Sequence, residues 1–389
     1  GGAGNDTLLG SAGSDNFDGD GGTDTVDYSG ATGGVTANLT TGLANNDGDG
    51  STDTFTEIEN LTGSSNNDTL TGNGSANTLD GGAGDDTLIG GASNDTLIGG
   101  AGTDTADYTG AASGITVDMS AVSNQVSNDG DGGSDTLSGI ENIAASDDDD
   151  DITGDSAANL IEGNDGDDIF RASGGADIYD GGDDTDRLDY SGYGAATSIS
   201  VALNGGADAT VTVNGGTDDT VRNVEDITGT SGNDTITGDI NANRLEGGAG
   251  DDTIAGRGGA DTLIGGAGTD TVSYAAAIGG INVNLAGNVA ANDGDGSADT
   301  LSGFENVTGS NFADTITGDA QANTILGGAQ NDTLDGGAGD DTLDGGSGDD
   351  VILGGAGDDD IDGGAGTEDT LDYSAAAAGV TVDLSVGQA

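Results

Sequence analysis

Hydrophobic residues recur along this chain with a period of nine. Gly81 to Ile89 reads GGAGDDTLI, Gly90 to Ile98 reads GGASNDTLI, and Gly99 to Asp107 reads GGAGTDTAD. Two glycines lead each segment, Asp stands at the sixth place, and an apolar residue stands at the eighth. A fixed period of this kind is typical of repeat architectures, in which each repeat contacts its neighbours.

The nonapeptides form five arrays separated by inserts. The arrays, with 25 nonapeptides in all, are residues 1–27, 63–107, 145–189, 229–273 and 309–372, the last with Glu368 as one extra residue. Inserts occupy 28–62, 108–144, 190–228 and 274–308, and a further one begins at Tyr373. An insert and the array after it make a unit of about 80 residues, so the predicted divisions are 1–27, 28–107, 108–189, 190–273, 274–372 and 373–389.

The inserts repeat one another as well. Each opens with a tyrosine, at Tyr28, Tyr108, Tyr190, Tyr274 or Tyr373. Apolar and polar residues then alternate at 35–39, 115–119, 281–285 and 380–384. This alternation predicts half-buried β-strands.

Within a nonapeptide, the glycines predict a tight turn and the residues after the sixth place predict a very short strand. Adjacent glycines permit positive φ and close backbone approach. In Thr87-Leu88-Ile89, only the central side chain can point inward. Two nonapeptides then make one coil, and stacked coils make an all-β parallel β-roll. Asp68, Asp86 and Asp104 should form one column, with Asp95 on the opposite edge.

Composition excludes most catalytic chemistry. The 389 residues include 72 Asp plus Glu, 5 Arg, 80 Gly, and no Cys, His, Lys, Trp or Pro. Mechanisms that use Ser-His or Cys-His pairs, a Schiff base or His-ligated zinc are therefore excluded, and we expect no enzyme here. A net charge of −67 repels nucleic acid and anionic lipid, and no apolar run is long enough to predict a membrane span.

The same charge predicts divalent cations as partners. One buried Leu or Ile per nonapeptide offsets only part of the chain entropy of nine ordered residues. Stacked carboxylates about 5 Å apart add repulsion, which a cation between turns reverses. Carboxylates and turn carbonyls are the hard oxygen donors that calcium prefers, and a flexible glycine turn suits calcium better than magnesium.

Several nonapeptides resemble the RTX (repeats-in-toxin) repeat GGxGxDxUx of secreted bacterial proteins. GGAGNDTLL, GGAGDDTLI, GGAGDDTLD and GGSGDDVIL carry the resemblance, which extends over all 25 nonapeptides. The inserts also resemble segments in RTX regions of serralysin-type proteases and giant surface proteins. The resemblance implies a β-roll with several calcium ions between its turns, and export through a type I secretion channel to the outside of the cell or its surface.

The resemblance also implies the calcium ligands, which are Asp residues at the sixth place. They are Asp6, Asp15, Asp24, Asp68, Asp86, Asp95, Asp104, Asp168, Asp177, Asp234, Asp252, Asp261, Asp270, Asp314, Asp332, Asp341, Asp350 and Asp359. The second nonapeptide of each later array has Asn instead, at Asn77, Asn159, Asn243 and Asn323, and we expect little calcium there. Arg171, Arg187, Arg244 and Arg257 make regular occupancy less secure between 145 and 260.

Three features of the inserts leave alternatives open. The sequence N-D-G-D-G, at 46–50, 128–132 and 292–296, is a plain turn or an additional calcium loop. The glutamates Glu59, Glu141, Glu225 and Glu305 recur in every unit, which favours a structural or calcium-capping role over catalysis. The insert tyrosines are expected to cover the ends of the rolls.

We favour a calcium-rigidified structural or adhesive segment of a large cell-surface, surface-layer or matrix protein, with copies of itself or other surface components as partners. The alternative is the folding and secretion module of a hydrolase whose catalytic domain lies outside this chain. Ice or glycan binding on a flat face is a third possibility, although Ala is commonest at the third place, where known ice-binding rolls carry Thr.

Overall fold

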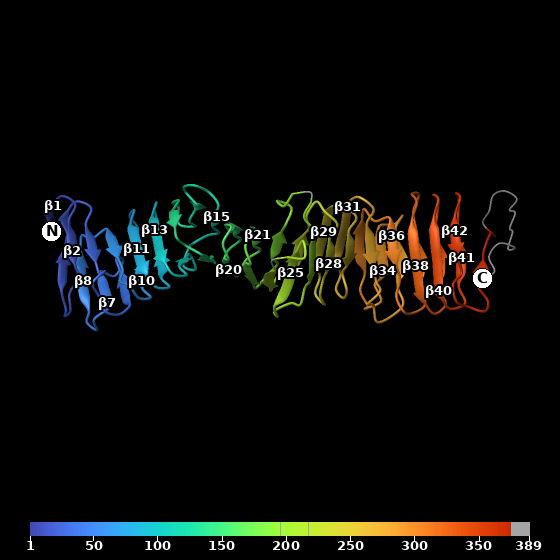
Figure 1. The fold of residues 1–389 in the computed structure, drawn as a ribbon, viewed down its shortest axis with the longest axis horizontal. Coiled ribbons are helices and arrows are strands. Elements are labelled where there is room, and N and C mark those ends of the chain that lie inside the picture. The colour runs from blue at the N-terminus through green and yellow to red at the C-terminus, as the bar shows by residue number, and fades with distance from the viewer. Residues whose placement is uncertain (195, 217, 375–389) are drawn as a thin grey trace. The chain divides into compact units, whose positions relative to one another are not determined.

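Short strands and tight turns alternate along the whole of this computed structural model, which describes residues 1–194, 196–216 and 218–374 (Figure 1). The strand β12 (Thr87–Ile89) is typical, because it buries only its central residue, Leu88. No helix occurs among the described residues, and none that could cross a membrane was found there. The predicted pattern of one inward side chain per nonapeptide is confirmed.

Each coil contains two nonapeptides, as the sequence predicts. The strands β10 (Thr69–Thr71), β12 and β14 (Thr105–Asp107) pair in parallel, with Leu70 opposite Leu88 and Leu88 opposite Ala106. Paired residues are therefore 18 positions apart. This spacing stacks every inward side chain on its equivalent in the next coil, so the core is a single column along each sheet.

The chain forms two compact units, one of residues 1–189 with 217–224 and the other of residues 190–216 with 225–389. In the first unit, one sheet contains β2 (Thr7–Leu9), β5 (Thr25–Asp27), β9 (Asn60–Thr62), β11 (Thr78–Ala83), β13 (Thr96–Ala101) and β17 (Thr136–Ser138). Beyond the second insert, a further sheet contains β19 (Asp151–Thr153), β21 (Ile169–Arg171) and β23 (Arg187–Asp189). The opposite sheet contains β3 (Asn16–Asp18), β8 (Asp53–Thr56), β10, β12, β14, β18 (Asn142–Ala144), β20 (Leu160–Asn164), β22 (Ile178–Gly182) and β26 (Asp218–Arg222). A short pair, β1 (Gly2–Ala3) and β4 (Asp20–Gly21), joins the turns of the first and third nonapeptides.

The second unit has the same two-sheet plan. One sheet contains β24 (Ile199–Ala202), β28 (Thr235–Thr237), β30 (Thr253–Ala255), β32 (Thr271–Ser273), β36 (Asn306–Thr308), β38 (Thr324–Ala329), β40 (Thr342–Ser347) and β42 (Asp360–Asp362). The other contains β27 (Asp226–Thr228), β29 (Arg244–Ala249), β31 (Thr262–Ala267), β35 (Asp299–Ser302), β37 (Thr315–Thr317), β39 (Thr333–Asp335), β41 (Val351–Leu353) and β43 (Thr370–Leu371).

Each insert stacks into the roll as an antiparallel meander. In the first insert, β6 (Val35–Asn38) lies on β10, β8 lies on β3, and β7 (Leu43–Asp47) runs antiparallel between β6 and β8. On the other sheet, β5 pairs directly with β9. The predicted strands at 35–39, 115–119 and 281–285 are confirmed as β6, β15 (Thr116–Asp118) and β33 (Asn282–Asn284), whereas 380–384 lies outside the described residues.

Successive inserts enter opposite sheets because the arrays have an odd number of nonapeptides. In the first unit, the second insert adds β15 and β16 (Val126–Asn128) between β17 and β19, on the sheet that the first insert left regular. In the second unit, β24 and β25 (Ala209–Val213) lie in the sheet of β28, whereas β33 and β34 (Val289–Asn292) lie in the opposite sheet, beside β35. Array length thus determines which face carries each meander.

The insert tyrosines are buried within the stack instead of covering its ends. Tyr28, Tyr108 and Tyr274 are at most 5% exposed, and their hydroxyls donate to Asp53, Asp135 and Asp299. The expectation of end covers was wrong for these three, because the strands continue past each insert and leave no free end there.

Candidate metal sites between the turns

Backbone hydrogen bonds to the sixth-place carboxylates join each coil to the next. The N–H of Asp68 donates to Oδ1 of Asp86 at 2.8 Å, and the N–H of Asp86 donates to Oδ1 of Asp104 at 2.8 Å. Asn77 donates in the same way to Asp95 on the opposite edge. The two predicted columns are therefore present, and we call each of them a carboxylate ladder.

The ladder continues through the irregular places in the sequence. Oε2 of Glu59, Glu141 and Glu305 accepts the N–H of Asp24, Asp104 and Asp270, in place of a sixth-place Asp. Near the end of the last array, the N–H of Asp350 donates to Asp369, which lies 19 residues away because Glu368 is extra. These three glutamates act as rungs of the ladder, and this backbone role supports the structural interpretation over catalysis.

Most ladder carboxylates have one oxygen with no donor. Within the described residues, Oδ2 is buried and has no hydrogen-bond partner in Asp6, Asp24, Asp86, Asp95, Asp104, Asp168, Asp252, Asp261, Asp270, Asp332, Asp341 and Asp350. All twelve are among the eighteen predicted ligands. A buried carboxylate oxygen without a partner is costly, and so many equivalent ones indicate a missing positive group.

The unpartnered oxygens face the first glycine of their own turn. A Cβ added at Gly327 would lie 2.6 Å from Oδ2 of Asp332 and 2.6 Å from the carbonyl oxygen of Gly345, one coil further on. A Cβ at Gly345 would likewise meet Asp350 and the Gly363 carbonyl. The glycine thus leaves space in which a carboxylate of one coil and a carbonyl of the next face the same point.

This donor set fits calcium. Calcium binds six to eight oxygen ligands in flexible geometry, from carboxylates, backbone carbonyls and water. Among the described residues, no group of three or more acidic side chains converges on one point, so each site would combine carboxylates with turn carbonyls. A cation there would pair the buried oxygens and join adjacent coils.

Five predicted ligands instead have a hydroxyl cap. Oδ2 of Asp314 accepts the N–H of Ser310 at 2.6 Å, and its Oδ1 accepts the Ser310 hydroxyl at 2.8 Å. Hydroxyls likewise reach Asp15, Asp68, Asp177 and Asp234 from Ser11, Ser64, Ser173 and Thr230. The eighteenth predicted ligand, Asp359, is half-buried and accepts the N–H of Asp341.

The second place of the nonapeptide separates the two kinds of turn. All five capped turns carry Ser or Thr there. The twelve turns with an unpartnered oxygen carry Gly, or a residue at positive φ such as Asp20, Asn164 or Arg257. The second place therefore identifies the capped turns from the sequence, whereas the predicted ligand set followed from Asp at the sixth place.

The asparagine turns are closed by an amide. Nδ2 of Asn77 and of Asn243 donates to the carbonyl oxygens of Glu59 and Glu225, at 2.6 and 2.9 Å. Asn159 and Asn323 do the same with Glu141 and Glu305. The amide supplies the positive end of a dipole where a carboxylate would need a cation, which supports the expectation of weak binding there.

These turns have a regular order along the chain. Each array after the first begins with a turn that has Ser or Thr at its second place, followed by an asparagine turn. In the last array, these are the turns of Asp314 and Asn323. From Asp332 to Asp350 they are followed by turns with Gly at the second place and an unpartnered carboxylate oxygen, which we call Gly-type turns. In the first coil after each insert, protein hydrogen bonds therefore satisfy the sixth-place side chains. Carboxylate oxygens without a donor begin in the second coil.

The comparisons with known proteins identify the repeat. The family described as the RTX calcium-binding nonapeptide repeat matches residues 1–30, 53–88, 71–106, 153–188, 223–243, 237–272, 308–343 and 335–367, more than half of the chain. The chain belongs to this family. RTX repeats bind calcium, so calcium is the cation that the ladders and glycine carbonyls would hold.

One solved structure shows a distant likeness. It is the extracellular lipase LipA from Serratia marcescens, with 19% sequence identity and a TM-score of 0.20. The match covers 57% of this chain and 37% of the lipase chain. No curated protein matches this RTX chain.

Arg171 does not disrupt the RTX ladder of the third array. Arg171 forms ion pairs with Asp151 and Asp189, which lie on outward positions of neighbouring strands. Asp168, in the same nonapeptide as Arg171, keeps a buried and unpartnered Oδ2. The third array therefore retains the arrangement of the regular ones at this point.

Burial raises the pKa of several ladder carboxyls above their ordinary value. The pKa rises to about 6 for Asp86 and to about 7 for Asp95, Asp252 and Asp332. Loss of hydration is the largest cause, and repulsion from the neighbouring rungs adds to it. Without a cation, the folded RTX roll therefore prefers these carboxyls protonated.

Acidification should consequently stabilise the calcium-free fold. In the unfolded chain these carboxyls titrate near pH ~3.9, so protonation favours the folded form fully below that pH. This contribution is lost as the pH rises through 6 to 7. In chelator, circular dichroism should show β structure increasing as the pH falls from 8 to 5. A calcium-free chain that loses β structure over this range would contradict the assignment.

The two kinds of turn should respond differently to isosteric substitution. Asp332→Asn with Asp350→Asn removes two carboxylates that have unpartnered oxygens, so we expect about two fewer calcium ions per chain. The calcium concentration at the folding midpoint should rise roughly tenfold, equivalent to about 1.4 kcal/mol for each ion bound on folding. Isothermal titration calorimetry gives the ion count, and circular dichroism during a calcium titration gives the midpoint. Asp314→Asn, at a capped turn, is the control and should leave the ion count unchanged; an equal loss in both variants would refute the distinction.

Proposed function

We propose that this chain is a calcium-dependent structural or adhesive segment of a large secreted or cell-surface bacterial protein. The observation that supports this most directly is the pair of carboxylate ladders, which recur in every array and join each coil to the next. Such a ladder is unstable while its carboxylates are charged and unpaired, and calcium between the turns makes it rigid. Calcium concentration is low in the cytosol and high outside, so folding would follow export.

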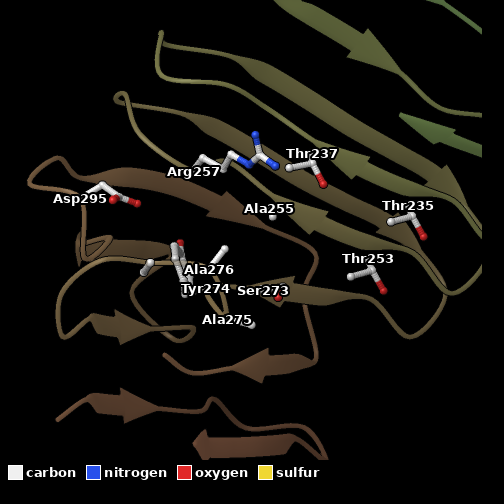
Figure 2. A pocket seen from close by; sticks show the side chains of 11 residues that line it. Thr235, Thr237, Thr253, Ala255, Arg257, Ser273, Tyr274, Ala275, Ala276 and Asp295 are labelled. Carbon is white, nitrogen blue, oxygen red and sulfur yellow. The ribbon is translucent and has the colours of Figure 1, made fainter. Parts of the chain in front are cut away.

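The chemistry of the chain supports a mechanical role over a catalytic one. It has no His, Cys or Lys, and the glutamates that recur in each unit accept backbone N–H groups. A hollow of about 270 Å³ in the second unit is lined by Thr235, Thr237 and Thr253 with several alanines, near Arg257 and Asp295 (Figure 2). This lining offers hydroxyls, one guanidinium and the exposed carboxylate of Asp295, with no imidazole, thiol or amine among its side chains.

The alternative to a structural role is that this chain is the folding and secretion module of a hydrolase. It uses the same calcium switch, but the rigid segment would then serve a catalytic domain elsewhere in the reading frame. A catalytic domain that loses activity when this segment is unfolded by chelator would favour that alternative. Self-association of the calcium-loaded segment, or its binding to bacterial surface material, would favour the structural role.

Folding of the isolated chain should depend on calcium. In chelator near pH 7.5, circular dichroism should show a mostly unordered chain, because the ladder repulsion is unopposed. At roughly 10⁻⁴–10⁻³ M calcium, the range typical of extracellular modules, β structure should appear cooperatively. Magnesium at the same concentration is the control and should be far less effective. A chain with full β structure in chelator at this pH would refute the proposed switch.

A further inference from the structure

Three inserts contain a tight loop built around one buried carboxylate. In the second insert, Oδ1 of Asp129 accepts the N–H groups of Asp131 and Gly133, both at 2.8 Å. Asp47 and Asp293 close the loops of the first and fourth inserts in the same way. These aspartates stand at the second position of N-D-G-D-G, outside every nonapeptide.

The second oxygen of each loop aspartate is buried and has no partner. Asp47, Asp129 and Asp293 are at most 1% exposed, and their Oδ2 atoms have no hydrogen-bond donor among the described residues. A side chain at Gly133 would clash with Oδ2 of Asp129 and with the carbonyl oxygen of Ser93, so these two oxygens face the same small space. The loop uses one carboxylate oxygen for its own fold and leaves the other for a ligand.

A second unpartnered carboxylate comes from the adjacent array. Asp95 and Asp261 are buried, and each retains an unpartnered Oδ2 of its own. Their N–H groups donate to Asp135 and Asp299, the insert aspartates that also accept the tyrosine hydroxyls. The second insert and the array turn before it thus contribute two buried oxygens that lack donors, from Asp129 and Asp95, and the fourth insert and its preceding turn contribute two more, from Asp293 and Asp261. We call each pair, together with Asp135 or Asp299, an insert cluster.

Each loop lies beside the array turn that contains the second carboxylate. In the second insert, Oδ2 of Asp129 faces the carbonyl oxygen of Ser93, which belongs to the same turn as Asp95. In the fourth insert, a Cβ added at Gly258, in the turn of Asp261, would lie 3.8 Å from Cβ of Asp295. The loop and the array turn are therefore neighbours, and a cation between them would pair carboxylates of both.

The third insert provides an internal comparison, because it lacks N-D-G-D-G. Its array aspartate, Asp177, has the place of Asp95 and Asp261, but its Oδ2 accepts the hydroxyls of Ser173 and Tyr179, at 2.9 and 3.1 Å. Where the loop is absent, hydroxyls thus replace the missing ligand. The first insert is intermediate, since Oδ2 of Asp15 accepts the Ser11 hydroxyl while Asp47 keeps its unpartnered oxygen.

We propose that the second and fourth inserts each bind one additional calcium ion, through Asp129 with Asp95 and through Asp293 with Asp261. The ligands are hard carboxylate oxygens, joined in the second insert by the Ser93 carbonyl, and water completes the shell. In the fourth insert, Tyr274, whose hydroxyl donates to Asp299, lines the hollow of Figure 2. The proposal goes beyond the function proposed above, because the loop ligands lie outside the RTX repeats.

The insert ion would connect the meander to the regular roll. The loop aspartates lie at the ends of strands that exist only in the inserts, whereas Asp95 and Asp261 belong to the arrays before them. An ion held by both would fix the insert against the preceding coil. The third insert, with its hydroxyl contacts, would be fixed without calcium.

Terbium luminescence can separate these sites from the RTX turns. Tb³⁺ takes calcium's oxygen ligands and is excited by energy transfer from nearby tyrosine, and the chain has seven Tyr and no Trp. Tyr108 and Tyr274 donate to members of the two clusters, so Tb³⁺ bound there should be strongly sensitised. Asp129→Asn with Asp293→Asn should remove about half or more of this emission, and native mass spectrometry should show two fewer calcium ions.

The matched control removes equal charge from the same loops. Asp131→Asn with Asp295→Asn changes exposed residues and should leave both the emission and the ion count unchanged. The single variants Asp129→Asn and Asp293→Asn keep the other site as an internal reference, so a loss restricted to one site is still measurable if the double variant folds poorly. Unchanged emission and ion count in these variants, or equal losses in the control, would overturn the proposal. The chelator experiment on folding tests the RTX turns separately.

Discussion

The structure depends on buried carboxylate oxygens that have no protein donor. Each coil presents a sixth-place residue, usually Asp, on both edges, and one oxygen of each such Asp accepts a backbone N–H from one coil away. The other oxygen faces a glycine and a carbonyl from the neighbouring coil. A protein with a net charge of −67 and only five arginines cannot neutralise these groups itself. The fold is therefore complete only with a cation, and family membership identifies that cation as calcium.

The turns of the roll differ in whether their carboxylates have a protein donor. Each array after the first begins with a Ser- or Thr-type turn and an asparagine turn, which close the coil next to the insert by hydrogen bonds. Gly-type turns, such as those of Asp332 and Asp341, follow and leave their carboxylates unpartnered. The chain thus alternates between segments that are satisfied by protein donors and segments that need calcium. Because the same order of turns recurs in every unit after the first array, it follows from the repeated sequence and not from one local irregularity.

Much of the fold followed from the period of nine, because one apolar residue per nonapeptide allows only one register. The stacking of Leu70, Leu88 and Ala106 and the two aspartate columns were predicted in this way. The insert topology was not predicted, since it depends on whether an array holds an odd or even number of strands. Nor was the burial of Tyr28, whose hydroxyl finds Asp53 across an insert. Periodicity describes one repeat at a time, whereas these features depend on contacts between repeats.

The sequence predicted which residue type lines the candidate site, but not which of the carboxylates have a hydroxyl donor. The sixth-place aspartates form the two predicted columns, but Asp68 and Asp314 accept a hydroxyl that Asp86 and Asp332 lack. The difference comes from the second place, where Ser can donate to the carboxylate and Gly cannot. Asp129 lies outside the repeat, so only the structure reveals its buried, unpartnered oxygen.

The most direct test is to locate the ions in crystals grown with calcium, using anomalous diffraction at a long wavelength. Calcium peaks should lie between successive coils beside the carboxylates of Asp86, Asp252 and Asp332, and should be absent beside the amides of Asn77, Asn243 and Asn323. Peaks of equal height at the Asp and Asn turns, or well-ordered coils with no peak between them, would contradict the account.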